Sequence, residues 1–181
     1  GPLDHLTALR VLADYVERKY DSSKMTIVSP DAGGVRLADT WSDRLRAPLA
    51  IIHKRHDPTV ANLVKVHEVV GDVAGRTCLL VDDMVDTAGT ICQAAGALFE
   101  HGADKVIVAA THAILSGPAA ERLNSQPFEE IIFTNTLPIP PGVHVEKATV
   151  LSVAPLLAQA IHEVFEDGSV ASLFNGGTQY C

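Results

Sequence analysis

The chain has 181 residues, of which 47% are hydrophobic and 20% are charged. This size and composition fit one α/β domain with a full core and exclude a disordered protein. The net charge of −8 argues against a general nucleic-acid binder. The sequence has no apolar run of membrane-helix length and no secretory signal pattern, so we expect neither a membrane nor a nucleic-acid partner. Three cysteines without a disulfide pattern favour a cytoplasmic location.

Hydrophobic periodicity predicts helices that alternate with strands. Helices are expected at residues 4–20, 35–46, 91–101, 118–124 and 154–165. Strands are expected at residues 25–28, 49–52, 66–70, 78–81, 106–110, 131–134 and 149–153. We expect loops at residues 53–65, which are polar, and at residues 137–142, which hold three prolines. The alternation predicts an α/β fold, with a mostly parallel sheet and helices on both faces.

The most informative segment is residues 79–90, with the sequence LLVDDMVDTAGT. A predicted strand ends at two adjacent carboxylates, Asp82 and Asp83, and a third, Asp86, follows. The next four residues are small and precede a predicted helix: Thr87, Ala88, Gly89 and Thr90. Small residues let a phosphate approach backbone N–H groups, and the positive end of the helix dipole favours an anion there. The turn therefore fits a phosphate site.

The two adjacent carboxylates fit a different part of the same ligand. Asp82 and Asp83 would repel phosphate, but they can accept hydrogen bonds from vicinal hydroxyls. Carboxylates followed by a phosphate turn therefore predict a sugar-phosphate site. The alternative is an ordinary strand end with a solvated acidic turn and a helix cap, which would suffice for an acidic pair alone.

Residues 79–90 resemble the phosphoribosyl pyrophosphate loop of the phosphoribosyltransferase fold. The resemblance is closest to the ribose-phosphate pyrophosphokinases, also called phosphoribosyl pyrophosphate synthetases. Further segments resemble that family in the same order: SPDAGG at residues 29–34, IHKR at 52–55, VVGDV at 69–73, TH at 111–112 with SGP at 116–118, and TNTLP at 134–138. The match covers about residues 4–174 and is most similar to actinobacterial members.

This resemblance implies a ribose-phosphate diphosphokinase, which moves the diphosphoryl group of ATP to ribose 5-phosphate. The products would be phosphoribosyl pyrophosphate and AMP. By the same resemblance, Asp82 and Asp83 face the ribose hydroxyls, and the stretch from Asp86 to Thr90 holds the 5-phosphate.

The resemblance also assigns a metal ligand and a catalytic residue. Asp31 is expected to bind the catalytic Mg²⁺, and Lys54 to neutralise charge on the transferred phosphates from a mobile loop. Without the resemblance, a turn aspartate and a solvated lysine are the ordinary alternatives. His56 occupies the place of a substrate-binding arginine that the family typically has. Histidine is mostly neutral at pH 7 and lacks the fork that grips phosphate, and Arg55 could substitute only if the backbone shifted.

Family members normally have about twice this length, in two similar domains, and the resemblance here is to the second. We therefore expect residues 1–181 to form a single phosphoribosyltransferase-like domain whose N-terminal partner domain is absent. The chain begins with Gly-Pro, which we expect to reflect processing or a cut. Alone, it should bind ribose 5-phosphate weakly and transfer little diphosphate.

The family also implies partners and leaves two alternatives open. The implied ligands are ribose 5-phosphate, ATP, and phosphate or nucleotide effectors, and the implied assembly is a homo-oligomer, a hexamer in the family. One alternative is a phosphoribosyltransferase that consumes phosphoribosyl pyrophosphate, although no segment supplies a base-binding hood. The other is a non-catalytic regulatory paralogue. The intact loop argues against this second alternative, whereas His56 keeps it open.

Overall fold

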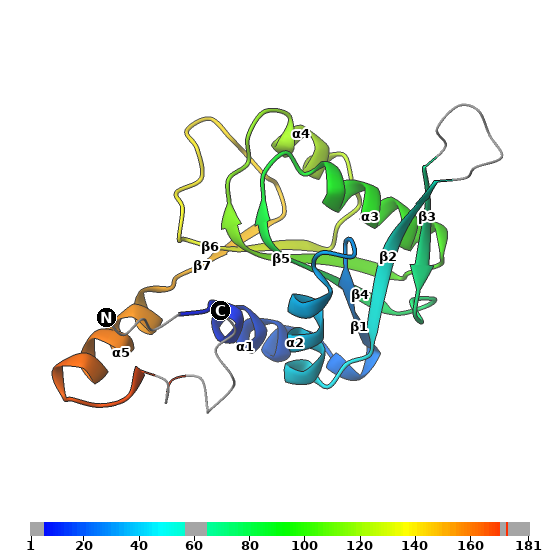
Figure 1. Cartoon of the computed structure of the whole chain (residues 1–181). Helices are drawn as coiled ribbons and strands as arrows, with labels where there is room; N and C mark the ends of the chain where they lie inside the picture. Colours follow the sequence, from blue (N-terminus) through cyan, green and yellow to red (C-terminus); the bar gives the residue numbers. More distant parts are fainter. Residues whose placement is uncertain (1–5, 57–64, 171–172, 174–181) are drawn as a thin grey trace.

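The computed structural model describes residues 6–56, 65–170 and 173. Seven strands form one sheet in the order β3-β2-β1-β4-β5-β6-β7 (Figure 1). The strands are β1 (Met25–Ser29), β2 (Leu49–His56), β3 (Lys65–Val70), β4 (Thr77–Val85), β5 (Lys105–Ala113), β6 (Glu130–Thr134) and β7 (Ala148–Leu151). The helices are α1 (Leu9–Lys19), α2 (Val35–Leu45), α3 (Gly89–Glu100), α4 (Ala119–Asn124) and α5 (Ala154–Phe165), with a 3₁₀ turn at Ser22–Lys24.

The sheet is mostly parallel, as predicted. Every neighbouring pair of strands is parallel except β2 and β3. All residues of β1 and β6 are buried. Such strands have helices or loops on both faces, so their sequences are nearly continuous apolar runs without alternation.

Helices cover both faces of the sheet, which confirms the predicted layers (Figure 1). On one face, α1 and α2 pack on the sheet through residues such as Leu12 and Trp41. On the other face, α3 contributes Leu98, which packs with Phe128 and Val108. The two helix layers therefore bury separate halves of the core.

The prediction of a loop at residues 53–65 is wrong at both ends, and at the second end Lys65 already belongs to β3. His53 to His56 continue β2, and the backbone of Lys54 pairs with that of His67 in the antiparallel strand β3. An antiparallel partner satisfies the backbone N–H and C=O groups, so even a polar segment can extend the sheet at its edge. Residues 57–64 lie outside the described part of the chain.

Strand β4 is also longer than predicted, because it continues past Val81 to Val85. Its pairing with β5 extends from Thr77 opposite Lys105 to Val85 opposite Ala113. The predicted polar turn after the strand therefore begins later. Asp82 and Asp83 lie inside β4 and not beyond its end.

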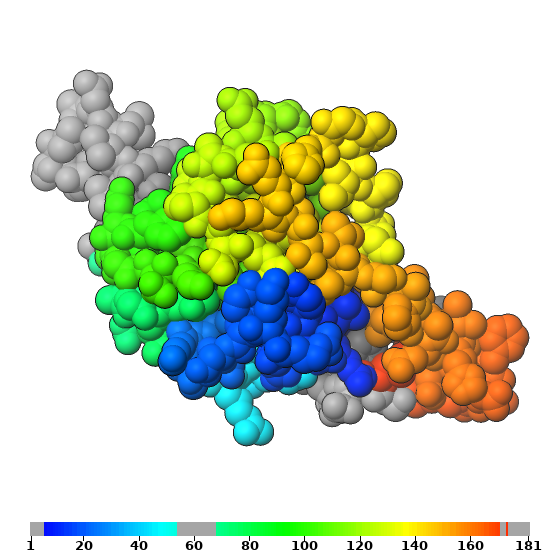
Figure 2. Space-filling model, turned by 180° about the vertical axis from the view of Figure 1, so that it is seen from behind, coloured from blue at the N-terminus to red at the C-terminus, as the bar shows by residue number. Residues whose placement is uncertain are grey.

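Helix α5 has the bounds that the sequence predicted and extends away from the sheet and its helices (Figures 1 and 2). It packs through Leu156 and Ala160, and the small cluster around it includes Val170 and Leu173. Four large apolar side chains on this helix are exposed: Leu157, Ile161, Val164 and Phe165, the last at 82%. None of the helices within the described ranges is long and apolar enough to cross a membrane.

Candidate sugar-phosphate site

The carboxyl ends of β1 and β4 meet at the point where the strand order reverses. β1 pairs with β2 on one side and with β4 on the other. After β1 the chain adds β2 and β3 on the first side, and from β4 onward it adds β5, β6 and β7 on the second side. Open α/β sheets bind ligands at such points. Asp31 follows β1, while Asp82 and Asp83 lie near the end of β4, and all three line one groove of about 640 Å³. The structure thus brings together three of the predicted site residues.

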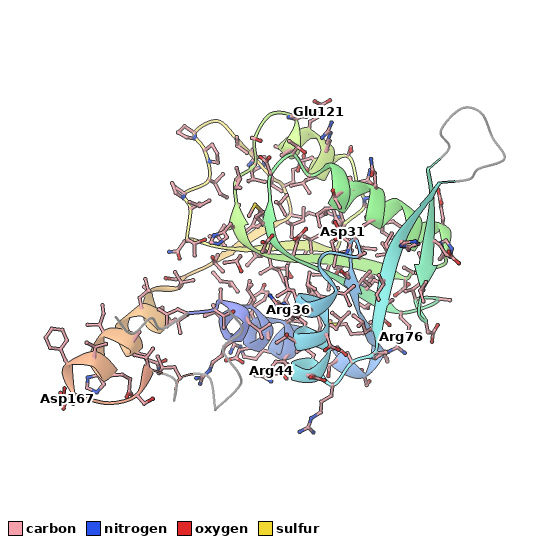
Figure 3. The ribbon with its side chains drawn as sticks, viewed as in Figure 1. Asp31, Arg36, Arg44, Arg76, Glu121 and Asp167 are labelled. Atoms are coloured by element: carbon pink, nitrogen blue, oxygen red, sulfur yellow. The ribbon has the colours of Figure 1, made fainter. Side chains whose placement is uncertain are left out.

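Asp31 shapes the turn that carries it into the groove (Figure 3). Its Oδ1 atom accepts hydrogen bonds from the N–H groups of Gly33 at 2.8 Å and Gly34 at 3.1 Å. A Cβ atom at Gly34 would lie 2.9 Å from the hydroxyl oxygen of Ser29, so this tight turn requires glycine there. Because the turn uses Oδ1, Oδ2 is the oxygen that could bind a cation.

Asp82 carries an unfavourable charge at the groove. Its Oδ1 accepts a hydrogen bond from the N–H of Asp83 at 2.9 Å. Burial, assisted by the nearby carboxylates of Asp83 and Asp31, raises the pKa of Asp82 to about 6. Like charges held in a partly buried site favour the binding of a cation or of hydroxyl donors.

A second, smaller pocket of about 150 Å³ lies at the start of α3. All five residues of the predicted phosphate stretch line it: Asp86, Thr87, Ala88, Gly89 and Thr90. Ala88 has left-handed backbone angles, with φ 60° and ψ 7°, and α3 begins immediately after it. The first N–H groups of a helix lack acceptors within that helix, so this pocket has the donors and dipole that bind phosphate.

The groove and the small pocket adjoin each other. Asp82 and Met84 line both of them. A ligand with hydroxyls at one end and a phosphate at the other could therefore span the two. Two adjacent pockets of these kinds are an arrangement that suits a sugar phosphate.

Two side chains distant in the sequence support the turn. Ser116 lies 30 residues after Asp86, and its hydroxyl donates a hydrogen bond to Asp86 Oδ1. Its N–H also donates to the Asp86 carbonyl oxygen at 3.1 Å. Arg122 of α4 donates from Nη1 to the Thr87 carbonyl oxygen at 2.9 Å. Residue spacing gave no signal for Arg122, and Ser116 was indicated only by the SGP segment.

His112 and Thr111, the TH pair of β5, also line the groove. The Nδ1 atom of His112 lies 2.8 Å from the hydroxyl of Thr136, which donates to the Thr111 carbonyl oxygen at 3.1 Å. This link holds the imidazole at the edge of the groove.

Lys54 and His56 have described backbones in β2, opposite His67 and Lys65 of β3. Their side chains lie outside the described part of the structure, so their predicted roles stay predictions. Within the described ranges, no group of three or more His, Cys, Asp and Glu side chains could by itself hold a metal ion.

Comparisons with known proteins agree with this geometry. A family model described as the phosphoribosyl synthetase-associated domain matches residues 58–175. The ribose-phosphate pyrophosphokinase of Streptomyces avermitilis is 66% identical over 175 residues, which cover 97% of this chain and 54% of that protein. The enzyme of that name from Mycobacterium tuberculosis is 53% identical over 177 residues, with the same two coverages.

Solved structures give the same result. The crystal structure of phosphoribosylpyrophosphate synthetase from Mycobacterium smegmatis superimposes with a TM-score of 0.83 and 48% identity, covering 93% of this chain and 54% of that one. An adenine phosphoribosyl transferase from Trypanosoma brucei shares the fold alone, with a TM-score of 0.52 and 18% identity over 80% of this chain and 64% of that one. The chain spans about half the length of the curated relatives it matches. The matched family model, the similar proteins and the shared phosphoribosyltransferase-type fold lead to one conclusion: the chain belongs to the ribose-phosphate pyrophosphokinase family.

Proposed function

We propose that this chain is the ribose 5-phosphate-binding half of a ribose-phosphate diphosphokinase. The complete protein would transfer the β,γ-diphosphoryl group of ATP to the anomeric hydroxyl of ribose 5-phosphate. The observation that carries the proposal is that the groove and the small pocket lie side by side and share Asp82 and Met84 as lining residues. The names of the similar proteins support the same reaction.

In this proposal the two pockets hold the sugar at both ends. Asp82 and Asp83 accept hydrogen bonds from the vicinal ribose hydroxyls, and the N–H groups at the start of α3 bind the 5-phosphate. The anomeric hydroxyl then attacks the β-phosphorus of ATP. The bond between that phosphorus and the oxygen bridging to the α-phosphorus breaks, AMP leaves, and the hydroxyl loses its proton to solvent. Fixing the sugar lowers the barrier mainly by orientation.

Asp31 would hold a Mg²⁺ ion through its Oδ2 atom. The fit is chemical, because a carboxylate oxygen outside the turn suits a hard cation and two further carboxylates line the same groove. The remaining ligands would be water and phosphate oxygens, as is usual for Mg²⁺. When bound, the ion supplies positive charge to the phosphates.

Lys54 and His56 complete the proposed machinery. Lys54 would place its ammonium group against the transferred phosphates, and His56 would face the sugar phosphate in place of an arginine. This replacement favours a second candidate function, a regulatory paralogue that keeps the fold and assembles with active subunits.

We propose that the complete protein is a cytoplasmic homo-oligomer that binds phosphate or nucleotide effectors. The exposed apolar side chains of α5 support a protein partner for this helix, because isolated domains rarely expose such a patch. Since the chain spans about half of its relatives, we propose that the other half of the protein covers α5.

The test compares two proteins in one assay of phosphoribosyl pyrophosphate and AMP formation. The complete protein that contains this sequence should form both products, and the 181-residue chain alone should form little. Asp83→Asn should abolish turnover in the complete protein, while Asp43→Asn, an exposed site on α2, should leave it unchanged. A folded complete protein without turnover would instead favour the regulatory paralogue. Normal turnover by the isolated chain would contradict the half-site proposal.

A further inference from the structure

We infer that Arg122 is a positioning residue for the phosphate turn, acting through the Thr87 carbonyl group. The inference rests on the proposed function, since it concerns how the same pocket binds its anion. Arg122 Nη1 donates to the Thr87 carbonyl oxygen at 2.9 Å, across 35 residues of sequence. Arg122 belongs to α4, which is fixed on the body of the protein by the buried residues Ala119 and Leu123.

The hydrogen bond fixes the direction of one N–H group. The peptide between Thr87 and Ala88 is trans, so its C=O and N–H groups point in opposite directions. A carbonyl group held against Arg122 turns the Ala88 N–H away from the guanidinium. Thr87 and Ala88 line the small pocket, whereas Arg122 is not among the residues that line it. The contact thus directs the Ala88 N–H toward the pocket side.

The turn requires such support because its backbone is strained. Ala88 has a φ of 60°, a left-handed conformation that residues with a Cβ atom rarely adopt. Ser116 holds the turn at Asp86, on the N-terminal side of Ala88, and Arg122 holds it at Thr87. Without one of these contacts, the peptide could rotate and lose the N–H direction that the phosphate needs.

Arg122 could also act simply as a nearby positive charge. A Cβ atom at Gly89 would lie 3.5 Å from its Nη1 atom, so the guanidinium is close to the proposed anion site. The two roles differ in their dependence on salt. Charge attraction is screened over about 3 Å in 1 M salt, whereas a fixed peptide orientation is not screened. They also differ for lysine, which keeps the charge and lacks the rigid fork.

The test uses the full 181-residue chain and isothermal titration with ribose 5-phosphate. Arg122→Met should weaken binding at least tenfold, and the ratio to the unmodified chain should persist in 1 M salt. Arg18→Met, which removes the same charge from an exposed site on α1, should change binding less than twofold. Arg122→Lys should also weaken binding several-fold, and it serves as the test variant if Arg122→Met does not fold.

A second readout needs no ligand. The backbone amide NMR signals of Ala88 and Gly89 in the free protein should shift in Arg122→Met and stay in place in Arg18→Met. Unchanged amide signals, a loss of affinity that vanishes in 1 M salt, or full affinity in Arg122→Lys would overturn the positioning role. If the unmodified chain fails to bind ribose 5-phosphate, the proposed function fails, and the amide signals still decide whether Arg122 orients the turn.

Discussion

The backbone N–H group of Asp83 donates a hydrogen bond to the Oδ1 atom of Asp82 at 2.9 Å, which orients the Asp82 carboxylate in the groove that Asp83 also lines. The arrangement is unfavourable in the absence of a ligand. Burial and the adjacent negative charges raise the pKa of Asp82 to about 6, whereas an unfolded aspartate titrates near ~3.9. The folded protein therefore loses stability when Asp82 ionises.

Asp82→Asn should stabilise the free chain by about 1 kcal/mol at pH 8 while it abolishes ribose 5-phosphate binding. The gain should disappear as the pH falls from about 6 toward ~4, because Asp82 is then protonated in the folded state. Urea unfolding of both proteins with a chelator present measures this difference in stability. Asp43→Asn is the control, with a change below about 0.5 kcal/mol. A variant that is less stable than the unmodified chain at pH 8 would refute this prediction.

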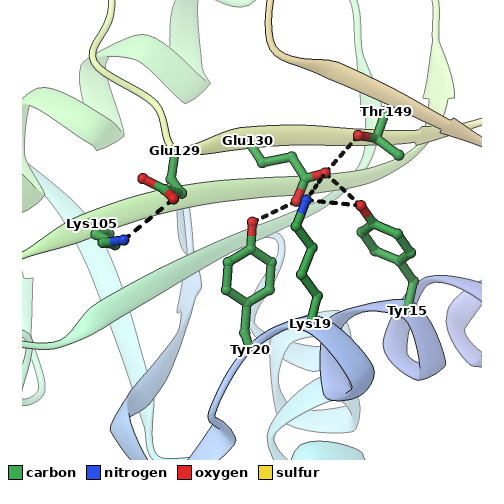
Figure 4. A network of polar contacts seen from close by, with 7 residues as sticks. All are labelled: Tyr15, Lys19, Tyr20, Lys105, Glu129, Glu130 and Thr149. Carbon is green, nitrogen blue, oxygen red and sulfur yellow. Dashed lines mark hydrogen bonds and ion pairs between the residues drawn. The ribbon is translucent and has the colours of Figure 1, made fainter.

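Glu130 connects α1 to the sheet through a buried side chain that is 6% exposed (Figure 4). Its Oε1 atom accepts hydrogen bonds from Tyr15, Lys19 and Thr149, and Oε2 accepts one from Tyr20 at 2.6 Å. Burial by itself would raise the pKa of Glu130, but these four hydrogen bonds outweigh it and lower the pKa to about 2. Since α1 residues line the groove, this contact also fixes one of its walls.

Glu130→Gln should destabilise the chain by about 2–4 kcal/mol at pH 7, because the four donors around this buried group lose their charged acceptor and an amide NH₂ group replaces one acceptor oxygen. A lowered carboxyl pKa stabilises the fold above the unfolded value near ~4.3, and this contribution is lost as the pH falls toward about 2. The difference between variant and unmodified chain should therefore shrink from pH 5 to pH 3. Guanidinium unfolding of both proteins at several pH values measures this difference in stability.

The adjacent residue provides a matched control. Glu129 is half-exposed and pairs with Lys105 at 3.3 Å on the surface. Glu129→Gln should cost less than about 1 kcal/mol, as surface ion pairs usually do. Equal losses of stability in Glu129→Gln and Glu130→Gln would show that the Glu130 hydrogen bonds do not contribute as described.

Ala88→Gly should change stability by less than about 0.5 kcal/mol, because the relief of left-handed strain, about 1 kcal/mol, offsets the loss of a buried methyl group, about 0.8 kcal/mol. Ala158→Gly, at an exposed position within α5, should lower stability by about 0.5–1 kcal/mol. Thermal unfolding of both variants compares the same substitution in a left-handed turn and in a helix. A loss at position 88 as large as that at position 158 would contradict the left-handed turn.

His56→Arg should raise the affinity of the complete protein for ribose 5-phosphate several-fold, because arginine adds a permanent charge and a forked contact. His144→Arg, at an exposed position outside both pockets, is the control and should leave the affinity unchanged. Titration at pH 8, where histidine is neutral, gives the largest contrast. An unchanged affinity would mean that position 56 does not bind the phosphate.

The fold was predictable where periodicity determines structure. The bounds of α5 and the central strands follow from apolar patterns that burial imposes on each segment. The extension of β2 was missed because pairing with β3, not the residues' own hydrophobicity, holds the polar end of that strand in the sheet. Contacts such as those of Arg122 and Glu130 join residues far apart in sequence, so no local pattern could indicate them.

The proposed two-part sugar-phosphate site is tested most directly by titrating the 181-residue chain with ribose 5-phosphate, ribose and inorganic phosphate in parallel. If the groove and the small pocket act together, ribose 5-phosphate should bind with one-to-one stoichiometry and at least about 100-fold more tightly than either part alone. Asp83→Asn should reduce this advantage, because it removes a carboxylate from the hydroxyl end. Binding of ribose 5-phosphate that is no tighter than that of inorganic phosphate would contradict the site described for this chain.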